Sequence, residues 1–159
     1  MEAAEIVQKL NEISLKKLEL IREILLYTRS ERDALTSDRL DDMQTLLDEK
    51  QLRMDAVDKL DEQFALLTDR LKSSLSLSSL EELPRHHLPG VKELKEVVGQ
   101  IHQLLGEIKE LEDENIALVK AEMQDTRDKI KQAENFKRVR GAYKPVNGNT
   151  PSYFFDTKK

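Results

Sequence analysis

The sequence predicts an all-α fold: an elongated antiparallel bundle of three long helices with coiled-coil-like packing, a short helical turn and an irregular C-terminal tail. Residues 1–83 contain neither Gly nor Pro, the residues that interrupt helices most strongly. The four prolines and five glycines all follow residue 83, and all except Gly99 and Gly106 lie at 84–90 or after residue 140. Apolar residues recur every three or four positions in the long segments between, as in amphipathic helices.

The first helix is predicted over residues 2–35. It carries two neighbouring apolar rows, with Lys17 in the one polar slot. A double row makes an apolar face wider than a coiled-coil seam, which is typical of a helix that faces more than one partner. The rows consist of Ile6, Leu10, Ile13, Leu20, Ile24 and Tyr27, and of Val7, Leu18, Ile21 and Leu25.

The second helix is predicted over residues 38–74, after a tight turn at Thr36, Ser37 and Asp38. These three residue types favour helix N-caps, and acidic residues just after them would complement the positive end of the helix dipole. One continuous helix through Thr36 is the alternative. The hairpin is favoured because the apolar stripe loses phase around 28–39. The stripe of the second helix consists of Leu40, Met43, Leu47, Met54, Val57, Leu60, Phe64, Leu67 and Leu71.

A loop is predicted over residues 75–90. Within it, Ser79 and Glu82 have the spacing of a capping box, which predicts one short helical turn over 80–83 before Pro84.

The third helix is predicted over residues 91–140. At about 1.5 Å per residue it would be roughly 70 Å long, against roughly 50–60 Å for the first two, so we expect it to overhang its partners. Gly99 and Gly106 are seven residues apart and share a helix face. They predict a place where another helix crosses closely.

The chain is predicted to divide into a helical bundle, residues 1–140, and a basic, aromatic tail, residues 141–159. From residue 137 onward there are six basic residues and one acid, a net charge of +5. Because the whole chain carries −5, residues 1–136 carry −10. Five of the seven aromatic residues lie from Phe136 onward. Such a tail is typical of a contact element, although packing against the acidic bundle is a comparable alternative.

Composition and motifs argue against several function classes. The absence of Cys excludes disulfides and thiol catalysis. The longest apolar run, residues 24–27, is far short of the ~20 residues of a membrane span, and no secretory signal precedes it. Adjacent His86 and His87 cannot converge on one metal. A net negative chain is a poor nucleic-acid binder. We therefore expect an intracellular protein that is not an enzyme and holds no metal or cofactor.

Three stretches together resemble the FlgN family of flagellar export chaperones. The first is the predicted hairpin over 18–47, with the acidic-Ala-Leu step Asp33-Ala34-Leu35 between its helices. The second is the Leu/Glu/Lys-rich run over 46–52. The third is the end of the chain, residues 142–159, which is similar to the tails of Gram-positive, clostridial-type members. The tail is the most specific of the three.

The resemblance implies a cytoplasmic, helical chaperone that binds C-terminal helices of the hook–filament junction proteins FlgK and FlgL. It would prevent their premature association and deliver them to the type III export apparatus, whose components are a second class of expected partner. Family partner binding lies toward the C-terminus. By region, this corresponds here to Val119, Met123, Ile130, Phe136, Val139 and Tyr143, with the tail aromatics Tyr153, Phe154 and Phe155.

A structural coiled-coil or scaffold protein is the alternative. It would use the same apolar faces for permanent self-association, so the oligomeric state is left open. Whether the tail contacts a client, the export gate or its own bundle is also left open by the sequence.

Overall fold

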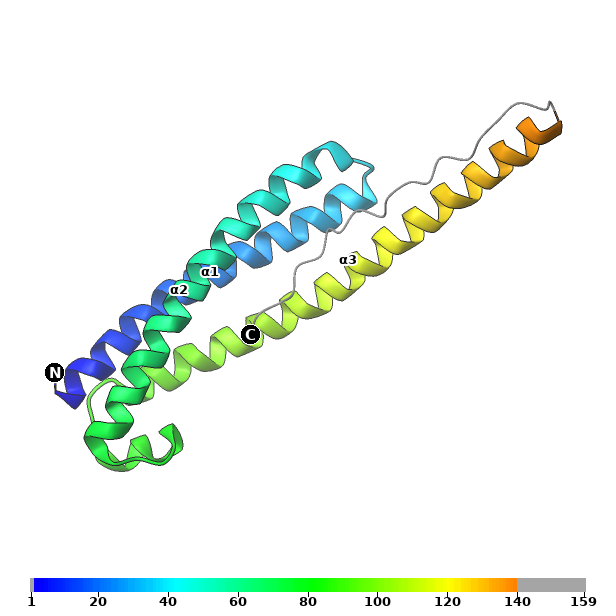
Figure 1. The fold of residues 1–159 in the computed structure, drawn as a ribbon. Coiled ribbons are helices and arrows are strands. Elements are labelled where there is room, and N and C mark those ends of the chain that lie inside the picture. Colours follow the sequence, from blue (N-terminus) through cyan, green and yellow to red (C-terminus); the bar gives the residue numbers. More distant parts are fainter. Residues whose placement is uncertain (1, 140–159) are drawn as a thin grey trace. The chain divides into compact units, whose positions relative to one another are not determined.

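A computed structural model describes residues 2–139, with side chains as far as Lys137 (Figure 1). Its elements are all helical. They are α1 (Ala3–Thr36), the 3-10 helix η1 (Leu40–Asp42), α2 (Met43–Leu75), the 3-10 helix η2 (Leu80–His86) and α3 (Val91–Val139). Residues 2–139 contain no strand, so the predicted all-α class is confirmed. The chain divides into two compact units, residues 1–111 and 112–159, and α3 passes from the first into the second.

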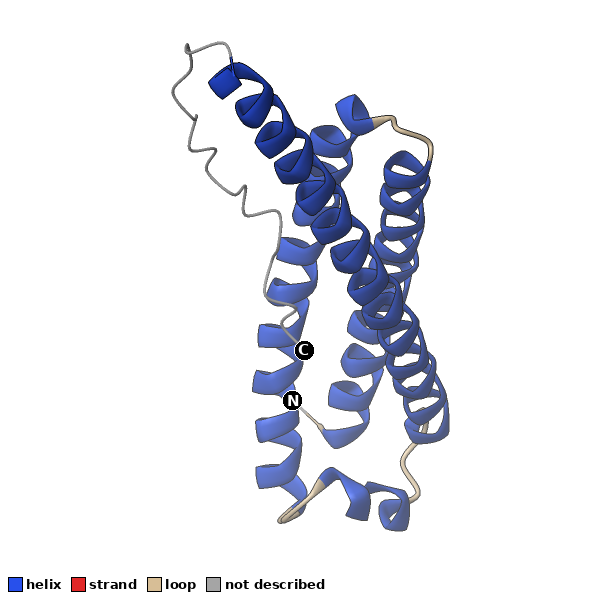
Figure 2. Cartoon of the chain, turned by 90° about the vertical axis from the view of Figure 1, so that its right-hand side faces the viewer, coloured by secondary structure: helices blue, strands red, loops and turns tan. Residues whose placement is uncertain are grey.

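The first turn makes α1 and α2 an antiparallel hairpin (Figures 1 and 2). Asp38 has φ +56°, a left-handed conformation that Asp adopts more readily than most residues. It lets the Arg39 N–H donate to the Ala34 carbonyl at 2.8 Å, which closes the end of α1. The predicted hairpin is thus confirmed. The predicted start of the second helix at 38 is wrong, because these polar residues end α1 and α2 begins at Met43.

The second turn ends α2 in the same way. Ser76 has φ +53°, and the Leu77 N–H donates to the Lys72 carbonyl at 2.9 Å. This is the long hydrogen bond of a Schellman motif, which satisfies a carbonyl at the end of the helix.

The predicted short turn at 80–83 is the 3-10 helix η2, which continues through Pro84 to His86. The predicted capping box takes a different form. The Ser79 hydroxyl accepts from the Glu81 N–H at 3.2 Å, whereas the Glu82 carboxylate accepts from the Ser78 hydroxyl at 2.8 Å.

The start of α3 is fastened to α1 at Gly90. The Asn11 side-chain amide donates to the Gly90 carbonyl at 2.9 Å, and the same carbonyl accepts the first helical bond from Leu94. Gly90 has φ +87°, and a Cβ built there would lie 2.8 Å from Asn11 Nδ2 and 3.3 Å from Val7 Cγ1. Glycine is therefore favoured here chiefly by the backbone conformation, and a Cβ would in addition push the Asn11 amide away from the Gly90 carbonyl.

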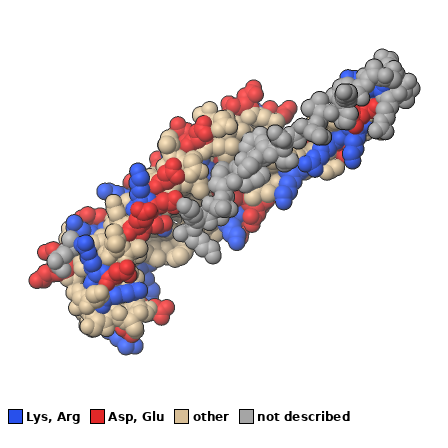
Figure 3. All heavy atoms as spheres, viewed as in Figure 1, with Lys and Arg blue, Asp and Glu red and all other residues tan. Residues whose placement is uncertain are grey.

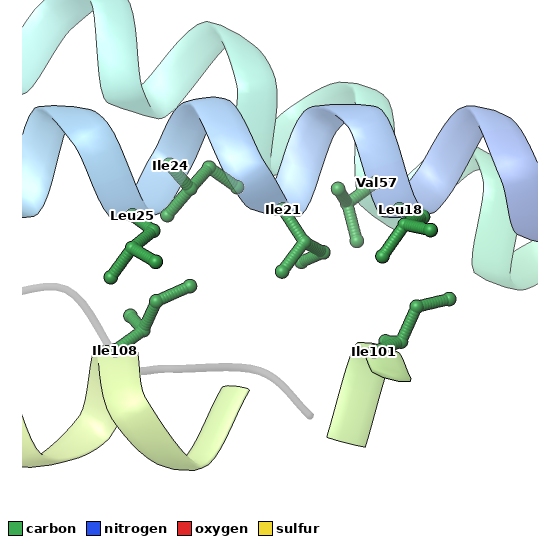
Figure 4. Close-up of a cluster of buried hydrophobic side chains, with 7 residues drawn as sticks. All are labelled: Leu18, Ile21, Ile24, Leu25, Val57, Ile101 and Ile108. Carbon is green, nitrogen blue, oxygen red and sulfur yellow. The ribbon is translucent and has the colours of Figure 1, made fainter. Parts of the chain in front are cut away.

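The core of the first unit consists of two clusters. Both are made by α1, α2 and the first part of α3, so the prediction that the first helix faces more than one partner is confirmed. In Figure 4, Ile101 and Ile108 of α3 point toward the α1 side chains. The two clusters consist of Leu18, Ile21, Ile24, Leu25, Val57, Ile101 and Ile108, and of Ile6, Val7, Leu10, Leu71, Leu83 and Leu94.

Gly99 and Gly106 do not mark a helix crossing. Both are exposed, and a Cβ at either would meet no other atom of the described chain within 4 Å. The prediction of a close approach at these glycines is wrong, because the core-facing positions of this segment are two residues away, at Ile101 and Ile108.

Candidate partner-binding surface

The second unit begins at Glu112, and its described part is the rest of α3. This helix has 49 residues, against 34 for α1 and 33 for α2. Burial along it falls toward the C-terminus: Val119 is buried, Met123 is half-buried and Ile130 is 42% exposed. Phe136 is 62% exposed. The predicted site residues of α3 are therefore increasingly accessible toward its end.

Helical register separates these residues into two sets. Met123 follows Val119 by one turn, and Ile130 follows Met123 by almost two, at about 100° per residue. These three residues share one face and form what we call the distal stripe. Phe136 lies about 120° around the helix axis from Ile130, so it borders the distal stripe and does not continue it.

The remaining predicted site residues lie outside this description. Val139 is the last residue of α3, and its side chain is beyond the described ones. Tyr143, Tyr153, Phe154 and Phe155 all lie outside the described residues. Their assignment to a partner site stays a prediction.

A buried ion pair inside the α1–α2 hairpin was missed by sequence reasoning. The Lys50 ammonium lies 3.2 Å from Glu31 Oε2, and the Lys50 side chain is 0% exposed. Ion pairs this deeply buried are costly to desolvate and depend strongly on both partners being present. The sequence signal is the position of Lys50, which falls between Leu47 and Met54 in the apolar stripe of α2.

Further ion pairs join α1 to α2 on the half-buried flank of the hairpin. Lys17, the polar slot of α1, pairs with Asp61 of α2 at 2.6 Å. Arg53 lies over the Tyr27 ring, 4.8 Å from its centroid, and also pairs with Glu49 and Glu23. The hydrogen bond with Glu49 raises the pKa of Arg53 above its ordinary value. Charge thus replaces apolar packing at several positions of this interface.

A second perturbed group lies in the connection between α2 and α3. Hydrogen bonds from the Ser78 hydroxyl and N–H lower the pKa of Glu82, with smaller contributions from nearby Arg85 and His86. Both bonds favour the ionised carboxylate. The residues belong to the cap of η2, so this shift has a structural cause.

The described residues hold no group of three or more His, Cys, Asp or Glu that could bind a metal ion. His86, His87 and His102 are all exposed. None of the helices in the described part combines the length and apolarity needed to cross a membrane. On the face shown in Figure 3, positive and negative side chains are interspersed over the surface. The site features that remain are apolar helix surfaces bordered by charge, which suit protein recognition.

Comparison with known proteins identifies a family. The family model described as FlgN protein matches residues 1–143. A search of curated proteins and a search of solved structures found no match. The family match stops short of most of the tail on which the resemblance to Gram-positive, clostridial-type members rests, so that subtype stays a prediction.

Proposed function

Because the chain belongs to the FlgN family, a family of flagellar export chaperones, we propose that it binds C-terminal helices of hook–filament junction proteins of the FlgK and FlgL kind. It does so in the cytoplasm, prevents their premature association and escorts them to the type III export apparatus. The role is binding without catalysis, and it needs no cofactor.

The observation that supports this proposal most directly is the distal stripe of α3. Ile130 is 42% exposed and Met123 half-buried on a helix whose other residues from 120 to 137 are almost all exposed. An amphipathic client helix could lay its apolar face on the distal stripe, using anchors one and two turns apart. Because Ile130 is 42% exposed, covering its remaining surface contributes about 0.6–1.3 kcal/mol, which corresponds to roughly three- to ninefold in affinity, and a charge at this position would add a desolvation cost.

The test is titration calorimetry of the full chain against the C-terminal helical segments of FlgK and FlgL from its own organism. We expect one-to-one binding with a micromolar or tighter Kd. Ile130→Asp should weaken this binding at least tenfold. The matched control is Ala121→Asp, which places the same charge on the opposite, exposed face of α3.

Equal affinity of the Ile130→Asp variant and the native chain would remove the distal stripe from the site. Phe136→Ala then distinguishes the neighbouring face, because Phe136 borders the distal stripe without belonging to it. No binding by the native chain, combined with a stable oligomer in light scattering, would favour a self-associating coiled-coil scaffold instead.

A further inference from the structure

A shallow groove runs between α1 and α2 in the first unit. It consists of two adjoining hollows of about 760 and 350 Å³, both lined by Lys16. Along α1 it extends from Lys9 to Glu23 and along α2 from Ala56 to Arg70, which is about 21 Å of helix on each side. Its apolar lining consists of Ile13, Leu20, Ala56, Leu60, Leu66 and Leu67. We call it the hairpin groove.

The hairpin groove lies on a different side of α1 from the contact with α3. Leu18 and Leu25 pack with Ile101 and Ile108 of α3 in the core. Leu20, which lines the groove, is two positions after Leu18 and therefore about 200° around the helix, and it is half-buried because it also packs against this cluster. Leu66 is 63% exposed although it lines an apolar groove. The hairpin thus presents an apolar surface that the first part of α3 does not cover.

The rim of the hairpin groove carries a surplus of positive charge. Its acidic residues are Glu12, Glu19 and Glu23, all from α1, and Glu23 already pairs with Arg53. On the α2 side the charged lining is cationic throughout. The lining cations are Lys9, Lys16, Arg22, Lys59 and Arg70, and none of them forms an ion pair within the described part of the chain.

An apolar floor beside a cationic α2 wall, opposite an α1 wall with three cations and three acids, is the counterpart of an amphipathic helix with acidic residues beside its apolar face. We propose that the hairpin groove docks such a helix from a partner protein, and that this is a second interaction surface, separate from the distal stripe. Lys59 and Arg70 are three turns apart, about 16 Å, so they set the spacing of two acidic residues along the bound helix.

Charge argues against the other two occupants. The chain's own tail carries six basic residues against one acid from residue 137 onward, so it would bring positive charge to a positive rim. A second copy docking through the same groove would bring the same surplus of positive charge against the rim. Like charges brought together across an interface are unfavourable.

The test uses the full chain and a labelled synthetic helix of about four turns, with Leu at the i, i+3, i+4 and i+7 positions and Glu on both flanks. Fluorescence anisotropy should show binding at least tenfold tighter than for the same helix with Lys in place of Glu.

Lys59→Glu with Arg70→Glu should weaken binding of the acidic helix at least tenfold. Lys95→Glu with Lys109→Glu changes the net charge by the same amount at exposed positions of α3, and this double variant should bind the acidic helix as tightly as the native chain does. Leu66→Asp should also weaken binding of the acidic helix, because it places a charge in the apolar lining of the hairpin groove.

Four results would overturn the proposal. The first is equal binding of the acidic and basic helices, and the second is equal loss in the two double variants. The third is tighter binding of a peptide of residues 140–159, which would make the tail the occupant. The fourth is that the native chain forms a dimer and does not bind the synthetic helix, while the Leu66→Asp variant is a monomer. This result would make a second copy the occupant. Unchanged far-UV circular dichroism in the variants confirms that the loss does not come from unfolding.

Discussion

Replacement of Gly90 by Ala should destabilise the protein markedly. A residue with a Cβ in the left-handed region costs about 1–2 kcal/mol. The new Cβ would also lie 2.8 Å from Asn11 Nδ2, so the amide must move and the hydrogen bond to the Gly90 carbonyl is lost. That loss adds about 0.5–1.5 kcal/mol. The total of about 1.5–3.5 kcal/mol corresponds to a fall in Tm of about 3–14 °C for a chain of this size.

Thermal unfolding followed by far-UV circular dichroism measures this effect, and two glycines of the same protein provide the control. Gly99→Ala and Gly106→Ala should each stabilise α3 by about 0.5–1 kcal/mol, since within the described residues neither new Cβ comes within 4 Å of a side chain or of another helix, and Ala favours a helix interior. In an Asn11→Ala background the cost of Gly90→Ala should shrink to the backbone strain alone. A Gly90→Ala variant as stable as the native chain would refute the reasoning.

Three further predictions concern the first unit. Lys50→Met should cost about 3–5 kcal/mol in urea unfolding, because it buries the Glu31 carboxylate without the ammonium, while Lys50→Met with Glu31→Leu should recover most of this loss. Ile21→Ala should cost about 2–5 kcal/mol in the same assay, because it opens a cavity between α1, α2 and α3. Ser78→Ala should raise the pKa of Glu82 toward its ordinary value in an NMR titration. Since the native pKa is depressed, the ionised carboxylate stabilises the fold above the unfolded pKa, and this contribution is lost as pH falls through the folded pKa. The pH dependence of stability should therefore be smaller in the variant.

The helices of this protein could be predicted from periodicity because their apolar rows are long and free of helix breakers. The turns could be predicted less well from the sequence. Thr36, Ser37 and Asp38 have the composition of an N-cap, but the same residue types also end helices when one adopts a positive φ. Sequence alone does not distinguish these outcomes. The heptad spacing of Gly99 and Gly106 was misleading for a similar reason, since small exposed residues and small crossing residues have the same pattern.

The candidate surfaces show the same division between local and non-local information. The distal stripe lies on one helix, so Met123 and Ile130 could be predicted by region from the family resemblance without knowledge of how the helices pack. The hairpin groove is made by residues of α1 and α2 that are roughly 45 positions apart in the sequence, as Lys16 and Ala56 to Leu60 illustrate. Its positive rim is hidden in a chain of net charge −5, because the charges are segregated by the fold.

The buried Lys50–Glu31 pair also favours the native alignment of α1 and α2. The apolar rows of both helices repeat, so sliding one helix past the other by a heptad would still bring apolar residues together. A slide in one direction would set the Lys50 ammonium opposite Ile24, a core residue that offers it no charge, whereas a slide in the other direction would set it opposite Asp38. The first of these misaligned hairpins is therefore penalised at a position where the native hairpin is satisfied. The polar pair thus makes the native alignment distinct from one of its repetitive neighbours, and with it the shape of every surface that the two helices share.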